Sequence, residues 1–221
     1  VLTAQTEMGQ GTFTALPQIA ADVLDVPFEA VEHAPVDTAV VPNSGPTVAS
    51  RTVMVVGGLV VDAARQLRAQ VEARTGRPFA ESYRDDIAAH GPTRVDVQFD
   101  GYPGIEWDQD HYRGDAYPAY SWAAAVASVD VDLDTGQVAV RRVVAVDDAG
   151  RVVNPVMALG QVEGGTLQAM GYATIEEMGV VDGRYRNDRL ATYLIPTALD
   201  APDIQAHLVE APFSDAPHGA K

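Results

Sequence analysis

Three segments place glycine or small polar residues directly before or inside a stretch with helical periodicity, and this pattern constrains the fold most. They are residues 9–12, 47–52 and 160–171. A glycine inside a helix costs about 1 kcal/mol relative to alanine, so each cluster needs a physical reason. Either another backbone packs closely there, or a ligand uses the N–H groups and the partial positive charge at the helix start. The spacing alone leaves both interpretations open.

Apolar periodicity predicts a mixture of helices and strands. We expect helices over about 14–24, 52–74 and 155–178, strands over 1–6, 94–99, 126–133, 137–146 and 204–210, and a turn between short strands at 180–185. Residues 26–49, 76–93 and 100–120 read as extended, mixed or loop segments. Because the elements do not alternate as regular βαβ units, the sequence predicts an α+β fold, with mixed β-sheets packed against helices.

Helix ends carry their own signals. Pro17 fits its helix only in the first turn, and Gly76 is a stop signal for the longest helix. Asn154 and Pro155 are suited to the cap and first turn of the last helix. We expect the chain to be one domain, with two sublobes over about 1–93 and 94–221.

The charge balance excludes some partners. Acidic residues outnumber Lys plus Arg by 31 to 15 among 221 residues, giving a formal net charge of -16. Such a field repels phosphate backbones and anionic lipid surfaces, so we expect neither a nucleic acid nor a membrane as partner. The chain has no Cys, which excludes thiolate ligands and disulfides. With no targeting segment ahead of Val1, we expect a cytoplasmic location.

Arg51 is the first Lys or Arg of the chain and stands at the predicted start of the longest helix. A cation there opposes the helix dipole, and a bound anion such as phosphate would remove that conflict. The alternative is a solvated arginine on a normally capped helix. In the third segment, Gln161, Gly164, Gly165 and Gln168 share one helix face, which suits a flat hydrogen-bonding group or tight helix packing.

No metal ligands are predicted within the chain. Its five histidines lack the spacing of metal ligands, and the acids near His111 lie in a segment without a period that would fix their separation. We therefore assign no metal site and no acid/base pair there.

In order along the chain, four segments resemble the molybdenum hydroxylases, the family of xanthine dehydrogenase and aldehyde oxidase. Residues 7–11 (EMGQG) resemble its Gly-Gln-Gly cofactor loop and 41–50 (VPNSGPTVAS) its second cofactor segment. Residues 154–165, with Asn-Pro and then GQVEGG, resemble the third, and 129–136 resemble the strand before it. The resemblance covers nearly the whole chain and implies the C-terminal molybdopterin-binding part of the large subunit.

The resemblance also implies the cofactor contacts. Gln10 and the amides of Gly9 and Gly11, with Met8 and Thr12 beside them, would meet the pterin or the molybdenum end. Ala49, Ser50, Arg51 and Thr52 would hold phosphate or the dinucleotide, and Gln161 would contact the pterin. With Arg51 at this position, the chain resembles bacterial members of the family that carry the cytosine dinucleotide form of the cofactor.

The family reaction is the hydroxylation of an aldehyde or an N-heterocycle, such as a purine, with oxygen derived from water. Electrons leave through iron–sulfur clusters and FAD on partner domains or subunits. The family's catalytic glutamate would follow Lys221, so no catalytic residue is expected within the chain. The resemblance thus implies a fragment that needs the remaining part of the molybdenum subunit, is inactive alone and self-associates through its uncovered apolar face.

The sequence allows two other functions. A non-catalytic scaffold could retain this fold, although Gly9, Gln10, Gly11, Arg51 and Gln161 argue against a lost site. A nucleotide-binding domain of another enzyme is disfavoured because no Walker or Rossmann pattern is present.

Overall fold

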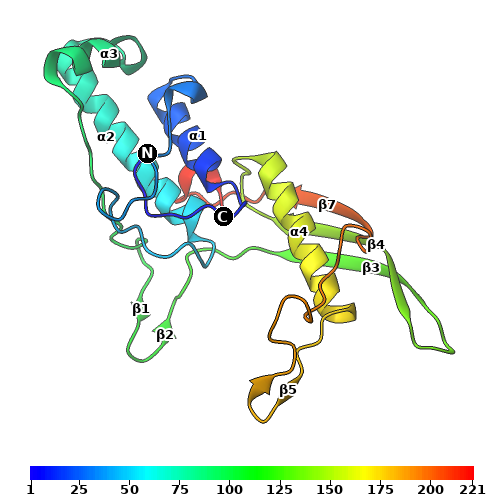
Figure 1. Ribbon diagram of the computed structural model, residues 1–221. Helices are drawn as coiled ribbons and strands as arrows, with labels where there is room; N and C mark the ends of the chain where they lie inside the picture. The colour runs from blue at the N-terminus through cyan, green and yellow to red at the C-terminus, as the bar shows by residue number, and fades with distance from the viewer. The chain divides into compact units, whose positions relative to one another are not determined.

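The computed structural model describes residues 1–221 and divides into two compact units (Figure 1). Unit 1 comprises residues 1–121, 149–154 and 210–221, and unit 2 comprises 122–148 and 155–209. Each unit contains helices and at least one small sheet, so the α+β class is confirmed. None of the helices combines the length and the hydropathy that crossing a bilayer requires.

Unit 1 is built on helices. They are α1 (Thr12–Leu24), a π-helical turn (Thr52–Val56) that runs into α2 (Gly57–Thr75), and α3 (Phe79–His90). Helices α1 and α2 lie side by side (Figure 1). Their buried residues recur three and four positions apart, as one helical face requires. The resulting core contains Leu16, Ile19, Ala20, Val56, Val60 and Val61.

Gly57 shows why a glycine stands in the long helix. A Cβ atom built on it would lie 3.1 Å from Ile19 Cδ1 and 3.2 Å from Pro217 Cγ. Two side chains therefore pack closely at this position and leave little room for a Cβ. The helix ends where Gly76 adopts a left-handed φ of 66°, as predicted.

Two predicted strands of unit 1 are wrong. Residues 1–6 and 94–99 are not paired in any sheet. Their burial does alternate, with Thr3 and Gln5 buried and Val95 and Val97 half-buried. The alternation correctly indicates extended chain, but a strand also needs a partner, which a pattern cannot supply.

Three further expectations of unit 1 need correction. Helix α3 replaces the mixed segment expected at 76–93. Pro17 is the sixth residue of α1 and lies beyond its first turn, so it removes one internal hydrogen bond. The loop at 100–120 contains a two-residue ladder between β1 (Trp107–Asp108) and β2 (Arg113–Gly114).

A charged clamp joins α3 to α2. Asp86 is buried and accepts two hydrogen bonds from Arg74, at 2.8 Å on Oδ1 and 2.6 Å on Oδ2. The hydrogen bonds from Arg74 outweigh burial and hold the pKa of Asp86 below its ordinary value. Ser82, also buried, donates to the Pro78 carbonyl at 2.9 Å. The inner face of α3 is thus largely polar.

Unit 2 contains a mixed three-stranded sheet in the order β3-β4-β7. Strand β3 (Ala123–Val131) pairs antiparallel with β4 (Val138–Asp148), and β7 (Asp203–Val209) pairs parallel with β4. Helix α4 (Pro155–Thr174) packs against β4 and β7. Strands β5 (Val180–Val181) and β6 (Arg184–Tyr185) form the expected turn. Helix α4 ends at Thr174 rather than near 178, since the N–H groups of Ile175 and Glu176 both bond to the Gly171 carbonyl.

Candidate functional site

The side chain of Gln5 joins the chain before residues 9–12 to the segment that leads into residues 47–52, within unit 1. It is fully buried and donates to the carbonyl oxygens of Ser44 (3.2 Å) and Gly45 (3.1 Å). Its Oε1 accepts from the Thr52 hydroxyl at 2.7 Å. Next along the chain, the Thr6 N–H bonds to Thr47 Oγ1 at 2.9 Å. The chain leading into the Gly9–Gly11 loop is therefore fixed along residues 44–52.

The loop before α1 wraps around the carboxylate of Glu7. Oε1 accepts the N–H groups of Gly9 (2.7 Å) and Gly11 (3.0 Å), and Oε2 accepts that of Phe13 (3.0 Å). Burial alone would raise the pKa of Glu7, but these N–H donors outweigh it and hold the pKa below its ordinary value. Gly9 and Gly11 have φ of 110° and 94°, a conformation that favours glycine. The predicted convergence of amides is present, and its acceptor is a carboxylate of the chain itself.

The other predicted residues of this loop differ in exposure. Gln10 folds back, with Oε1 accepting from the Met8 N–H at 2.7 Å and Nε2 donating to Thr6 O and Thr12 Oγ1 at 2.7 and 2.8 Å. Met8 is exposed, whereas Thr12 is buried. A ligand at this loop would therefore meet Met8 first and would engage Gln10 by replacing one of these internal bonds.

The second segment holds an unusual backbone at the start of the long helix. Ala49 and Ser50 have φ of 59° and 54°, the left-handed region that residues with a Cβ rarely adopt. The π-helical turn begins at Thr52. Strained backbone and π-turns both concentrate at functional positions of proteins. Residues 49–52 thus combine strain with the first N–H groups of a helix, which lack intrahelical acceptors.

Arg51 has no carboxylate partner. Its Nη1 donates to the carbonyl oxygens of Ser44 (2.5 Å) and Pro46 (3.3 Å). These contacts lay the guanidinium over Gly45, where an added Cβ would lie 2.7 Å from Nη1. The contacts are to neutral carbonyls, so the positive charge stays uncompensated. This is the electrostatic condition under which a phosphate is attracted.

Gln161 lies on α4, in unit 2, on a face that is open. Gln161, Gly164, Gly165 and Gln168 are all exposed, and nothing lies within 4 Å of a Cβ built on Gly160, Gly164 or Gly165. Only Gly171 of this helix packs tightly, with Pro196 at 2.5 Å from its added Cβ. Tight packing within the chain therefore does not explain the three open glycines. A flat group could lie against this face.

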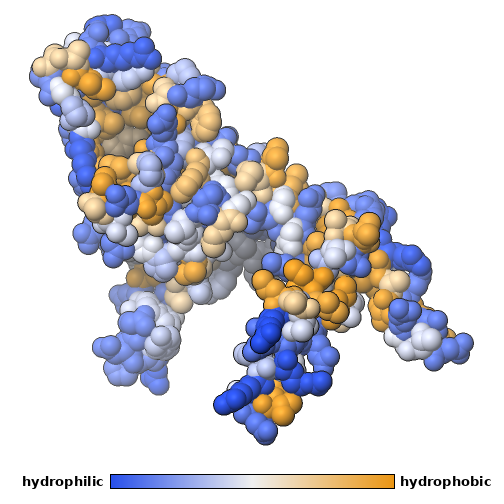
Figure 2. Space-filling view, viewed as in Figure 1, coloured by the Kyte–Doolittle hydropathy of each residue, from blue (hydrophilic) through white to orange (hydrophobic).

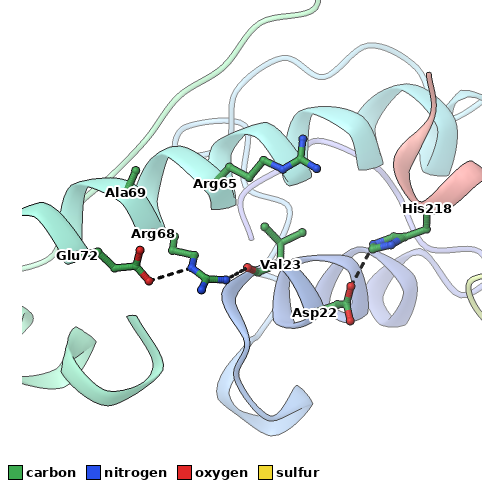
Figure 3. Close-up of a pocket in the computed structure, with 7 residues that line it drawn as sticks. All are labelled: Asp22, Val23, Arg65, Arg68, Ala69, Glu72 and His218. Atoms are coloured by element: carbon green, nitrogen blue, oxygen red, sulfur yellow. Dashed lines mark hydrogen bonds and ion pairs between the residues drawn. The ribbon is translucent and has the colours of Figure 1, made fainter. Parts of the chain in front are cut away.

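A shallow cavity of about 380 Å³ lies elsewhere in unit 1, and none of the predicted site residues lines it (Figure 3). Its charged side chains are largely matched to one another. Arg68 donates to Glu72 at 2.9 Å and to the Val23 carbonyl at 3.1 Å, and His218 Nε2 faces Asp22 at 3.7 Å. We assign no ligand to this cavity.

Three residues that organise the site were not predicted as contacts: Gln5, Glu7 and Ser44. Glu7 and Ser44 do lie in the segments 7–11 and 41–50 that carry the family resemblance. Gln5 and Glu7 alternate with exposed residues in a segment without a helical period, so no site pattern marked them. A signal was nevertheless present for Glu7, because an acid two and four residues before glycines can accept their N–H groups.

Known proteins resemble this chain in sequence and in fold. The family described as the molybdopterin cofactor-binding domain matches residues 1–202. Xanthine dehydrogenase of Oryza sativa subsp. japonica is 32% identical over 207 residues, which cover 89% of this chain and 15% of that protein. Among solved structures, quinoline 2-oxidoreductase from Pseudomonas putida 86 matches with a TM-score of 0.78 and 28% identity, over 98% of this chain and 30% of that chain.

Aldehyde oxidoreductase from Desulfovibrio gigas matches with a TM-score of 0.81 and 26% identity, over 94% of this chain and 23% of that one. The chain therefore spans less than a third of the length of each of these proteins.

Proposed function

This chain belongs to the molybdopterin cofactor-binding domains of the molybdenum hydroxylase family, and from that premise we propose that it holds part of the cofactor of an oxidoreductase. The enzyme would hydroxylate an aldehyde or an N-heterocycle, such as a purine, with oxygen derived from water. The names of the relatives, which refer to xanthine, quinoline and an aldehyde, support this choice of substrates. The catalytic residues would lie outside the chain, and the chain alone would be inactive.

Residues of the segments 9–12, 47–52 and 160–171 would contact the cofactor. Met8, Gly9, Gln10, Gly11 and Thr12 would lie at the pterin or molybdenum end. The phosphate or dinucleotide would bind at Ala49, Ser50, Arg51 and Thr52, and Gln161 would contact the pterin. The open α4 face and the uncompensated Arg51 charge fit a flat, anionic cofactor. When bound, the molybdenum supplies the two-electron chemistry, and the residues of this chain bind and orient the cofactor.

The observation that carries the proposal is the buried Gln5 side chain, which ties the Gly9–Gly11 loop segment to the Arg51 segment. One rigid frame thereby serves both predicted cofactor contacts of unit 1. Arg51 further supports the cytosine dinucleotide form of the cofactor, since the extra phosphate of a dinucleotide suits a planar guanidinium.

Arg51→Ala tests the phosphate contact. We expect the holoenzyme that contains this chain to retain its nucleotide form of the cofactor about tenfold or more less tightly, because a charge-assisted hydrogen bond is lost. The measurement is molybdenum and cytidine nucleotide per protein after gel filtration. Arg65→Ala is the matched control, since Arg65 is an exposed arginine of α2 whose side chain is 70% exposed. Equal cofactor content in both variants would contradict the role of Arg51.

The partners follow from the size of the relatives. We propose that the remaining part of the molybdenum subunit, and iron–sulfur and FAD domains or subunits, complete the enzyme in the cytoplasm. Apolar side chains on unit 2 support such contacts, since many lie at its surface (Figure 2). The most exposed among them are Leu133, Leu190 and Leu199, each more than 90% exposed.

The same exposed surface leads us to expect self-association of the isolated chain. Uncovered apolar area on this scale favours contacts between copies. In sedimentation velocity, the weight-average sedimentation coefficient should rise with protein concentration. A single monomeric boundary at every concentration would contradict the prediction.

A further inference from the structure

The carboxylate of Glu7 is the centre of the loop that precedes α1. It accepts three backbone N–H groups, those of Gly9, Gly11 and Phe13, within 3.0 Å. The three donors lie within residues 9–13, and this stretch of backbone curls around one side chain. Three charge-assisted hydrogen bonds to a single group are a strong local constraint.

The rest of the loop depends on the same curl. The Gln10 side chain can bridge the Met8 N–H, the Thr6 carbonyl and the Thr12 hydroxyl only while the chain turns tightly between Thr6 and Thr12. Beyond the curl, the Phe13 ring stacks on His33, with centroids 4.3 Å apart. Glu7 therefore acts on Gln10 through the backbone, without touching its side chain.

The backbone amides at this loop are already committed. With Glu7 in place, the Gly9 and Gly11 N–H groups point to the carboxylate and away from solvent-borne acceptors. What the loop offers to a ligand is then the exposed Met8 and the Gln10 side chain. A loop whose shape is set before binding does not pay its ordering entropy when the ligand arrives.

We infer that Glu7 is a positioning residue, which shapes the Gly9–Gly11 loop in the absence of cofactor and sets where Gln10 meets it. The inference rests on the proposed function for its consequence in the enzyme. The shape of the loop itself can be tested without any cofactor.

Glu7→Gln is the decisive variant, because glutamine keeps the size of the side chain while its amide nitrogen cannot accept a hydrogen bond. Amide hydrogen exchange is measured on the full chain. Protection of the Phe13 amide, which donates to Oε2, should fall about tenfold or more relative to the original chain. Protection of the Gly9 and Gly11 amides should fall less, because the neutral amide oxygen of glutamine can replace Oε1. Glu29→Gln, the same change at an exposed position, should leave all three unchanged. Unchanged protection in Glu7→Gln would overturn the inference.

The pH dependence gives a second readout, which needs no variant. Because the pKa of Glu7 is lowered by folding, its contribution is complete above the ordinary glutamate range of about 4.3 and disappears as the pH falls through the lowered value. His33 is the titratable side chain that faces Glu7. When His33 is protonated, its positive charge favours the ionised carboxylate, so the contribution of Glu7 is lost at a lower pH. Protection of the three amides should fall with acid in the original chain, while that of the Gly76 amide, which bonds to a backbone carbonyl, stays constant. A parallel decline of all four would overturn the inference.

In the holoenzyme, Glu7→Gln should release cofactor about tenfold faster. A release rate equal to that of the Glu29→Gln holoenzyme would contradict the consequence for the cofactor. The two proposals fail separately. If Arg51→Ala retains full cofactor, the assignment of the phosphate contact fails while the amide protection by Glu7 still stands.

Discussion

Leu16→Ala should lower the free energy of unfolding by about 3 kcal/mol, since it removes a fully buried side chain from the core of unit 1. Leu16 packs in one cluster with Ile19, Val56 and Val60, so the truncation leaves a cavity between α1 and α2. Urea unfolding followed by far-UV circular dichroism measures the change. The holoenzyme should lose cofactor as well, because α1 supports the Gly9–Gly11 loop.

Val40→Ala is the control for this truncation. Val40 is 52% exposed in the same unit, and we expect a change within about 0.5 kcal/mol. Similar losses in the two variants would show that the α1–α2 contact does not form the core.

Gly150→Ala should lower the free energy of unfolding by a similar amount, about 3 kcal/mol. Gly150 has a φ of 63°, and a Cβ there would lie 2.4 Å from the carbonyl oxygen of Gly219 and 2.8 Å from the nitrogen of Lys221. Both contacts are backbone atoms, so relief requires the final segment to move. The variant adds left-handed strain of about 1 kcal/mol to this collision. Exchange of the Arg151 amide, which bonds to the Gly219 carbonyl at 2.8 Å, should quicken.

Gly76→Ala separates strain from collision. Gly76 has a similar φ of 66°, but nothing lies within 4 Å of a Cβ placed on it. It should therefore show the strain alone, about 1 kcal/mol. If Gly150→Ala destabilises the chain no more than Gly76→Ala does, the segment 210–221 is not held as the structure describes.

The sequence predicted those elements that carry a regular apolar pattern. Helices α1 and α2 and strands β3, β4 and β7 were found because their apolar residues follow one period. Helix α3 was missed because Ser82 and Asp86 occupy its inner face, where hydrogen bonds replace apolar packing. The strands expected at 1–6 and 94–99 were wrong because these segments pair with no other strand. Pairing depends on residues that are distant in sequence.

The sequence predicted the segments that make up the site, but it did not predict the hydrogen bonds that join them. Arg51 stood out because it is the first cation of an acidic chain. The frame that holds it comes from Gln5 and Ser44, which are 39 residues apart. A glutamine and a serine at that separation carry no pattern, so only the fold shows that they meet. The cofactor contacts of Gln10, Arg51 and Gln161 stay predictions for the experiments above.

Unit 1 is assembled from three separate stretches of chain, and this has a consequence for synthesis. On the ribosome, α2 emerges with Gly57 uncovered, because Pro217, which packs on it, is made much later. At a synthesis rate of about 5–20 residues per second, that surface stays exposed for roughly 10–30 s before Pro217 is made. All of unit 2 is translated in the interval, so the nascent chain carries an uncovered α2 surface while the sheet of unit 2 is already complete. We therefore expect chaperone binding to be most useful during this window, before residues 210–221 are made.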